Sequence, residues 1–489
     1  GKIVELYAGG SKKLATNSSG VTVTGDATIN GSVSASDGLS ANNLDSAFNI
    51  LSAGTDLTDI FGPGGSAGNI NGSGTACYLP VWSDADTIGN SIAFQSSTVL
   101  SVAGTISSRG YCSVGTDTIF GTQALNATST GGQNTAIGLQ AMLANTSGYQ
   151  NVAVGEAALQ CNTEGLRNTA VGCGALLSNT TGDCSVAVGC QAGFSNQTGN
   201  SQVAIGSRAL YNSTVGENVA VGSCALEANT TGIQNTAVGH RALDSNTIGK
   251  CNVGIGFNTL YKNVTACGNV AVGNYALYNN SCGEKNTAVG NCALWNNTEG
   301  WYNVAVGHST LCSNTTGEYN VAIGRQALNA STTADYNVGI GRQALWCNTT
   351  GCHNIALGQS SLYCNETGCY NVAIGGCAMN CNIGGYFNVA LGCGTMYHAN
   401  SGYHNNAIGY LALYCNFGGH GNNAFGRDAL GCTTTGNCND AMGYRALYKN
   451  TTGSNNVAIG AFAMSEGESG DYNVAVGKYA ANQNESTRN

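Results

Sequence analysis

From residue 117 to residue 477, apolar and polar residues follow one pattern that repeats every 17 residues. The pattern reads Asn-Val-Ala-Val-Gly-x-x-Ala-Leu-x-x-Asn-Thr-Thr-Gly-x-x and occurs 22 times, and its positions are numbered 1 to 17 from the leading Asn. The step between copies is 17 residues throughout, except from Gln202 to Asn218, where it is 16. Such a strict period predicts a solenoid in which each copy forms one coil and packs against the coils on either side.

Positions 1 to 5 of the repeat predict a short β-strand that ends in a turn. Position 3 is Ala in 19 of 22 copies, and position 4 is apolar in every copy. Adjacent apolar positions are typical of a strand that is buried on both faces. Position 5 is Gly in all 22 copies, which indicates a positive φ or a backbone contact too close for a Cβ atom.

The second half of the repeat predicts another core contact and a turn. Position 8 is Ala in 18 copies and position 9 is Leu or Met in 20. This spacing fits either a short strand or a single helical turn. The following Asn-Thr-Thr-Gly has turn chemistry, because Asn and Thr side chains bond to nearby backbone and Gly frees φ. The leading Asn, present in 19 copies, is expected to form amide ladders along the solenoid.

These patterns predict an all-β fold, a repetitive parallel β-solenoid or β-roll of 17-residue coils. One coil buries only about an Ala, a Val, an Ala and a Leu. A lone solenoid this thin would leave one apolar face exposed, and three chains packed side by side would cover it. We therefore expect a homotrimeric fibre.

The first 116 residues lack the repeat and are divided into three segments by composition. Residues 1–36 alternate polar and β-branched residues and predict a β-stalk. Residues 37–76 are expected to hold a short helix at 40–53 and a Gly-rich linker, because Leu44, Ala47, Phe48 and Leu51 have helical spacing. Residues 77–116 predict a β-rich insert, and residues 117–489 form the rod.

Composition excludes several classes of function. Charged residues make up 9% of the chain, the net charge is −9, and no Lys/Arg cluster occurs, so we expect no nucleic-acid partner. No apolar run approaches the ~20 residues of a membrane helix, so we expect no membrane insertion. The chain lacks the HExxH and GxxxxGK[ST] motifs, and its GxSxG match at residues 64–68 lies in the predicted Gly-rich linker and not between a predicted strand and a predicted helix. We therefore expect a protein that is not an enzyme and has no catalytic residues, no cofactor and no metal site.

The 22 cysteines occupy positions of the repeat and form no zinc-finger pairs. Cys347, Cys364 and Cys381 share one position in three successive coils, and Cys415 and Cys432 share it further on. Small residues fill this position in other copies, which favours a semi-buried structural role. Axial disulfides and, less so, a ladder of metal-bound thiols are the alternatives. In a protein assembled in a bacterial cytoplasm the cysteines should be mostly reduced.

Aromatic residues recur at two positions of the repeat. Position 17 holds a ring in seven successive coils, and position 10 holds rings in several others. Such rows can be packing ladders, or they can stack on sugar faces. The candidate glycan-contact residues are Tyr261, Tyr278, Trp295, Tyr302, Tyr319, Tyr336, Trp346, Tyr363 and Tyr370. An ice-binding row of threonines is a third interpretation, although Glu164, Val215, Ile248 and Glu299 interrupt it.

Two resemblances add expectations about function. The first 110 residues or so resemble tail-fibre and appendage proteins of tailed phages, including the stretch Tyr-Leu-Pro-Val-Trp. The segments that carry this likeness are 4–7, 10–14, 19–25, 74–75, 78–82 and 88–91. The Asn-x-Ala-Ile/Val-Gly-x-x-Ala core of the repeat resembles the head β-roll of trimeric autotransporter adhesins.

The phage resemblance implies a virion or extracellular location and virion tail or baseplate proteins as partners. It also implies attachment to a host surface, which the ring rows would direct to a glycan. Residues 1–116 would then face the particle. The alternative is a non-viral extracellular fibre or cell-surface adhesin with a structural role.

Overall fold

The computed structural model describes residues 117–125 and 129–482, and before them the backbone of ten short strands. The chain divides into two compact units, Gly1–Gly104 and Thr105–Asn489. The repeat lies in the second unit. The predicted domain boundaries within the first 116 residues stay predictions.

The first unit contains short antiparallel strands. Strands β1, β2 and β3 form one sheet in that order, β6, β9 and β10 form a second, and the pairs β4–β5 and β7–β8 are separate. The bounds are β1 Glu5–Ala8, β2 Ser11–Asn17, β3 Gly20–Val23, β4 Leu51–Ser52, β5 Thr55–Asp56, β6 Cys77–Tyr78, β7 Val81–Trp82, β8 Ile88–Gly89, β9 Ala93–Ser96 and β10 Val99–Val102.

The helix expected at residues 40–53 is not found at its C-terminal end. Leu51 and Ser52 form β4, which pairs with Thr55 and Asp56 of β5. Only two residues separate these strands, the length of a tight hairpin, so local pairing takes precedence over the helical spacing of the apolar residues. The other residues of the predicted helix lie outside the described part of the chain.

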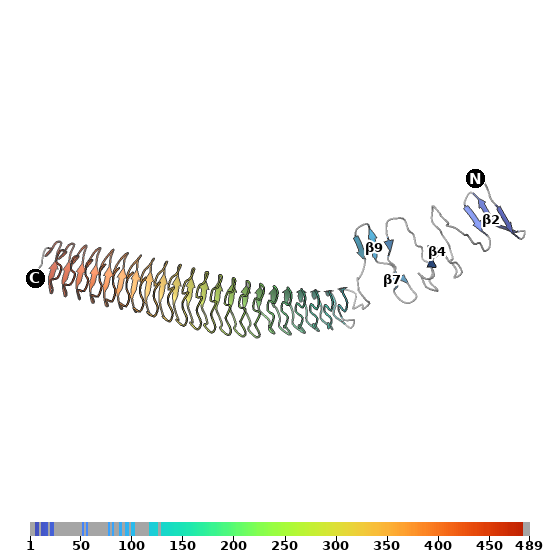
Figure 1. Cartoon of the computed structure of the whole chain (residues 1–489), viewed down its shortest axis with the longest axis horizontal. Coiled ribbons are helices and arrows are strands. Elements are labelled where there is room, and N and C mark those ends of the chain that lie inside the picture. The colour runs from blue at the N-terminus through green and yellow to red at the C-terminus, as the bar shows by residue number, and fades with distance from the viewer. Residues whose placement is uncertain are drawn as a thin grey trace. The chain divides into compact units, whose positions relative to one another are not determined.

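The second unit is a parallel β-solenoid, as predicted. Its 22 strands form one sheet in sequence order, and they stack like rungs from the teal end to the red end of the rod (Figure 1). The strands are β11 Thr118–Phe120, β12 Thr135–Ile137, β13 Val152–Val154, β14 Thr169–Val171, β15 Val186–Val188, β16 Val203–Ile205, β17 Val219–Val221, β18 Thr236–Val238, β19 Val253–Ile255, β20 Val270–Val272, β21 Thr287–Val289, β22 Val304–Val306, β23 Val321–Ile323, β24 Val338–Ile340, β25 Ile355–Leu357, β26 Val372–Ile374, β27 Val389–Leu391, β28 Asn406–Ile408, β29 Asn423–Phe425, β30 Asp440–Met442, β31 Val457–Ile459 and β32 Val474–Val476.

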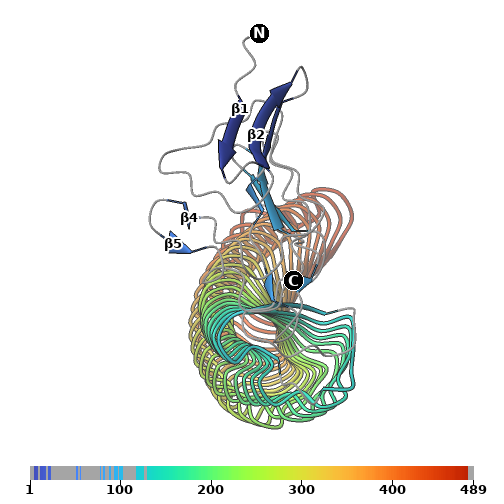
Figure 2. The same cartoon turned by 90° about the vertical axis from the view of Figure 1, so that its right-hand side faces the viewer.

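Register along the sheet follows the repeat, so each residue lies over the residue at the same position of the next coil. Ala136, for example, pairs with Ala153, and Ala153 pairs with Ala170. We call such a set of equivalent residues a row. Viewed along the rod, the coils overlie one another with a gradual rotation (Figure 2).

Each coil encloses a small apolar core of its own. The residues at positions 3, 8 and 9, such as Ala288, Ala293 and Leu294, have no exposed surface. The outer face of the strand is different, because the residues at positions 2 and 4 stay partly exposed, as with Val289 at 36%. The prediction that the strand is buried on both faces is therefore wrong for a single chain: the core lies on one face only.

The segment after the strand is neither a short strand nor a helical turn. Two successive tight turns follow Gly290, closed by bonds from the Ala293 amide to the Gly290 carbonyl and from the Asn297 amide to the Leu294 carbonyl. The residues at positions 7 and 9 have left-handed backbone, as shown by Cys292 at φ 55° and Leu294 at φ 51°. Left-handed backbone costs a non-Gly residue about 1–2 kcal/mol, and full burial of the Leu side chain offsets this cost.

The leading asparagines form the predicted amide ladder, and they are buried. The side-chain oxygen of Asn303 accepts a bond of 3.0 Å from the Asn320 amide of the next coil. Its side-chain nitrogen donates to the Gly317 carbonyl at 2.8 Å. Each leading Asn therefore ties its own coil to the next and holds the turn at position 15.

A second ladder runs through the asparagines at position 12. The side chain of Asn297 donates to the side-chain oxygen of Asn280 at 2.8 Å and to the Gly300 carbonyl at 3.0 Å. The leading Asn of the same coil, Asn286, donates to that carbonyl too, at 2.8 Å. One backbone oxygen thus receives two buried amides, which uses both of its lone pairs.

The glycine at position 5 is required by close backbone contact. At Gly273, φ is 127°, and a Cβ atom would lie 2.7 Å from the carbonyl oxygen of Gly290 in the next coil. The clashing atom belongs to the backbone of the stacked coil and cannot rotate away. This contact recurs along the rod and explains why no copy replaces this residue.

One coil departs from the pattern. The step from β16 to β17 is 16 residues, and Gln202 replaces the leading Asn. The longer side chain of Gln202 donates to the Val215 carbonyl, which stands where other coils have a Gly carbonyl. Among the described residues, the side-chain oxygen of Gln202 has no hydrogen-bond partner, so the amide ladder is interrupted between this coil and the next.

We expect Asn303→Ala to lower the free energy of unfolding by about 2–3 kcal/mol, because it leaves the buried Asn320 amide without a partner and removes one of the two bonds to the Gly317 carbonyl. Denaturant unfolding followed by circular dichroism measures this loss. Asn291→Ala is the matched control, since Asn291 is exposed in the preceding coil. Equal stability of the two variants would show that the ladder contributes little.

Gly273→Ala should cost about 3 kcal/mol or more, since the strained backbone alone accounts for about 1–3 kcal/mol and the added Cβ meets a fixed carbonyl. Gly376→Ala provides the comparison, because a Cβ there meets nothing nearer than the Sγ atom of Cys393 at 4.0 Å. Thermal unfolding of both variants measures the difference. Similar midpoints would contradict the close-contact explanation.

Candidate ligand-binding surface

The predicted ring row at position 17 forms one continuous stack. Neighbouring ring centroids lie 4.7–5.1 Å apart. We call this set the seven-ring ladder; it consists of Tyr302, Tyr319, Tyr336, His353, Tyr370, Phe387 and His404. Each residue has left-handed backbone, as Tyr302 does at φ 57°, and this shared conformation repeats the ring at every coil.

Stacking leaves mainly ring edges and hydroxyl groups open to solvent. Tyr336 and Tyr370 are about half exposed, at 50% and 49%, although a neighbouring ring covers each of their faces. At the start of the ladder, the Lys285 ammonium lies 4.9 Å from the Tyr302 ring centroid and donates to its hydroxyl at 2.8 Å. This bond raises the pKa of Lys285. Contact between a sugar and an inner ring of the ladder would have to involve its edge.

The ring row at position 10 is divided into shorter stacks. Tyr261, Tyr278 and Trp295 follow one another at centroid distances of 5.2 and 6.4 Å. Trp346 and Tyr363 form a separate pair at 5.1 Å. The nine candidate glycan-contact residues therefore belong to three stacks and are not gathered in a single site. Burial raises the pKa of Tyr363, so this hydroxyl stays protonated at neutral pH and can donate a hydrogen bond.

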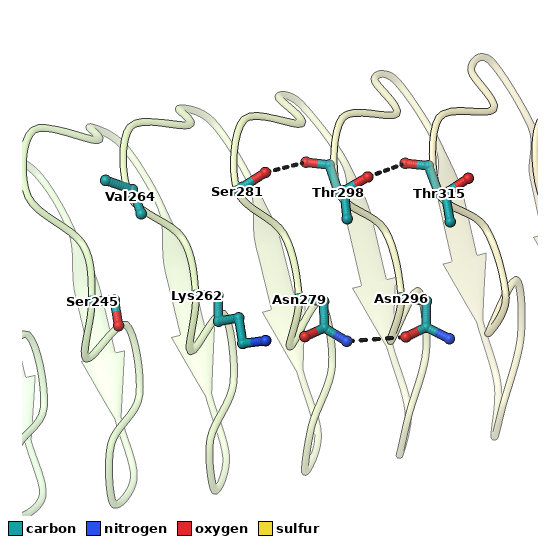
Figure 3. A pocket seen from close by; sticks show the side chains of 8 residues that line it. All are labelled: Ser245, Lys262, Val264, Asn279, Ser281, Asn296, Thr298 and Thr315. Atoms are coloured by element: carbon teal, nitrogen blue, oxygen red, sulfur yellow. Dashed lines mark hydrogen bonds between the residues drawn. The ribbon is translucent and has the colours of Figure 1, made fainter.

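A groove that the sequence analysis did not identify runs beside the first of these stacks. It has a volume of about 530 Å³ and lies between the rows at positions 11 and 13 (Figure 3). Its lining residues are Ser245, Lys262, Val264, Asn279, Ser281, Asn296, Thr298 and Thr315. The Lys262 ammonium lies 5.7 Å from the Tyr278 ring centroid, so the groove adjoins the stack of Tyr261, Tyr278 and Trp295.

The groove presents polar groups at the spacing of the coils. Asn279 donates to the side chain of Asn296 at 3.0 Å, and Ser281 and Thr298 each donate their hydroxyl to the next coil at 3.0 Å (Figure 3). The hydroxyl oxygens and the outer amide atoms can still bond to a ligand. The arrangement suits an elongated, hydroxyl-rich molecule that lies along the rod. The polar residues on either side of the Asn at position 12 are the feature of the sequence that could have indicated this groove.

The cysteines of the described residues are free thiols. Burial is the main cause that raises the pKa of the Cys347 and Cys364 thiols; at Cys364 a hydrogen bond to Cys381 opposes it. These thiols are therefore protonated and weakly nucleophilic near neutral pH. The reduced state of the cysteines stays a prediction.

Within residues 117–125 and 129–482, no group of three or more His, Cys, Asp or Glu side chains is placed to hold a metal ion. Among the described residues there is no helix with the length and apolar character needed to cross a membrane. Comparison of the chain with known proteins found no matching family model, curated protein or solved structure. The strand order and register show a parallel β-solenoid repeat protein of 17-residue coils.

Proposed function

We propose that this protein is a non-enzymatic structural fibre of a virion, a phage tail fibre or similar appendage, that attaches to glycans on a host surface. Its N-terminal region would join tail or baseplate proteins of the particle. The resemblance of that region to phage appendage proteins supports the proposal that the fibre is part of a virion. The observation that carries the adhesive role is the solenoid itself, which repeats the same surface groups over 22 stacked strands.

Repetition compensates for weak individual contacts. Each coil offers only a few hydroxyl and amide groups and, in places, a ring edge. A polymer that touches several coils binds its later segments at a high effective concentration, and avidity can exceed single-site affinity by about 10²–10⁴. Surface polysaccharides are long, hydroxyl-rich and repetitive, so they match both the groove and the ring rows. The low charge of the rod, 9% over the chain, favours neutral sugars over strongly ionic ligands.

The exposed face of the sheet supports a homotrimer. Position 4 is apolar in all 22 strands, and position 2 is mostly Val or Thr. Ile323 and Ile340 are each 38% exposed on this face. A continuous apolar row along the whole sheet is typical of an interface, because soluble monomers usually expose only a few hundred Å² of continuous apolar surface. Two further copies of the chain would cover it, because identical rods carry the same row at the same spacing.

A non-viral extracellular fibre or adhesin is the alternative function. It would use the same solenoid and the same exposed rows, so the rod does not separate the two proposals. Peptides of this chain in purified virions would favour the phage appendage. Their absence from virions, together with the protein on a cell surface, would favour the alternative.

Replacing Trp295, Tyr302 and Trp346 by Ala should reduce attachment to host cells at least about tenfold, because several weak sites act together. The rod should stay folded, because two of the three rings are exposed and the third, Trp346, is partly exposed. Tyr472→Ala is the control, because Tyr472 is 62% exposed and outside the seven-ring ladder. Unchanged attachment of the triple variant would make the rod a spacer and place recognition elsewhere.

Ile323→Lys should shift the assembly from trimer toward monomer, because it places a charge in the proposed apolar interface. Sedimentation or light scattering gives the mass, and circular dichroism checks the fold. Thr316→Lys adds the same charge at an exposed turn and should leave the mass unchanged. A monomeric parent protein would rule out the trimer.

A further inference from the structure

Of the 20 free cysteines in the part of the chain that the structure describes, nine lie directly above or below another cysteine in the next coil. They form a row of three and three pairs, and in every case the residue numbers differ by 17. We call them the thiol rows; they are Cys347–Cys364–Cys381, Cys173–Cys190, Cys352–Cys369 and Cys415–Cys432. We propose that neighbouring thiols of these rows bind soft monovalent cations, Cu(I) or Ag(I), each held linearly between two sulfur atoms.

The coil spacing matches this coordination. The amides of Cys347, Cys364 and Cys381 make equivalent bonds to the next coil, at 2.9, 2.8 and 2.8 Å. The three residues therefore share one backbone conformation and repeat at the spacing of stacked strands, about 4.8 Å. A zinc–thiolate bond is about 2.3 Å long, and if the bonds to a soft monovalent cation are of similar length, a cation midway between two sulfurs spans about 4.6 Å. The match requires only small side-chain rotations.

The same spacing disfavours a disulfide. The Cα spacing of stacked coils, about 4.8 Å, lies within the disulfide range of about 4.4–6.8 Å, but Cβ atoms at the same spacing lie slightly beyond the usual 3.5–4.5 Å. A disulfide would therefore draw neighbouring coils slightly together, and the glycine backbones at position 5 are already in contact. The stack thus favours neighbouring thiols that face each other without a bond between them.

The number of donors selects the metal. Zinc in structural sites takes four ligands in a tetrahedron, and the described residues contain no group of three or more His, Cys, Asp or Glu suited to a metal. Soft thiolates favour Cu(I), and a cation that is satisfied by two ligands needs only one pair. The thiol rows thus suit Cu(I) or Ag(I) and do not suit Zn²⁺.

Binding of the cation releases protons. Burial raises the pKa of Cys347, Cys364 and Cys381, so the free thiols are protonated near neutral pH. One cation displaces one proton from each of two thiols and leaves a bis-thiolate complex with a single negative charge; no electron is transferred. Below the thiol pKa, the apparent affinity should therefore rise about 100-fold for each unit of pH.

The row of three provides a matched pair of variants. Cys364→Ser removes the shared middle sulfur, so Cys347 and Cys381 are two coils apart and no adjacent pair remains. Cys347→Ser removes one sulfur but keeps the pair Cys364–Cys381. Both variants are made in the full chain in which Cys173, Cys292, Cys352 and Cys415 are also Ser, because these replacements remove the neighbouring thiols of the other thiol rows and of Cys292 and Cys312.

Anaerobic titration with Cu(I) against a competing chelator measures the affinity. We expect Cys364→Ser to bind Cu(I) at least about 100-fold more weakly than the background chain, because two linked sulfur donors raise the affinity by about that factor over one donor. Cys347→Ser should bind Cu(I) nearly as tightly as the background chain. X-ray absorption should show two sulfur neighbours at about 2.3 Å or slightly less. Circular dichroism of each variant confirms that the rod is folded.

Three results would overturn the proposal. The first is equal Cu(I) affinity in the Cys364→Ser and Cys347→Ser variants, which would point to single, unpaired thiols. The second is Zn²⁺ binding as tight as Cu(I) binding, which would require a different ligand set. The third is the loss of free thiols from this row in air without metal, which would identify a disulfide.

Discussion

The structure depends on buried asparagine amides that meet at one backbone carbonyl in most coils. In the coil that starts at Asn286, this residue and Asn297 both donate to the carbonyl of Gly300. A coil of 17 residues is so thin that its turns lie against its own core. Their polar groups are out of reach of water and would destabilise the fold without partners. The two Asn rows supply those partners and connect each coil to the next.

Small apolar residues follow from this constraint. Two amides and three apolar side chains must share the interior, so Ala fills positions 3 and 8 and only position 9 carries a large side chain. Leu294 reaches the core from a left-handed backbone at φ 51°. Local strain and a narrow core are thus two results of the same tight coil, and neighbouring coils stabilise both because they repeat the same contacts.

Much of the structure of the rod could be predicted from the sequence, because the repeat period shows which residues stack on one another. The parallel strands, the ladder of leading asparagines, the close contact at Gly273 and the stacking of Tyr302 on Tyr319 all follow from placing identical positions over one another. The left-handed backbone at Cys292 and Leu294 could not be predicted, because it depends on the path that the two turns take to close the coil. Composition also could not show that Val289 faces outward, since apolar residues occupy both faces of the strand.

The candidate surface was predicted in part for the same reason. The ring rows were visible as repeated positions, but their mutual coverage depends on side-chain direction, as at Tyr336 and Tyr370. The groove beside Lys262 and Asn279 is lined by residues of different types, so no recurring residue type indicated it in the sequence. In the first unit, the pairing of Leu51 with Asp56 depends on a short local connection that helical periodicity does not reveal.

The 16-residue coil has a mechanical consequence. The strands lie across the rod, so a pull along its length loads the interfaces between coils in series, and every interface carries the same force. A chain of links in series fails at its weakest link. The interface between β16 and β17, where the step is one residue shorter, the Gln202 oxygen lacks a partner and the ladder of leading amides is interrupted, is therefore one place where a stretched rod should part. The coils on either side would remain intact as two separate segments.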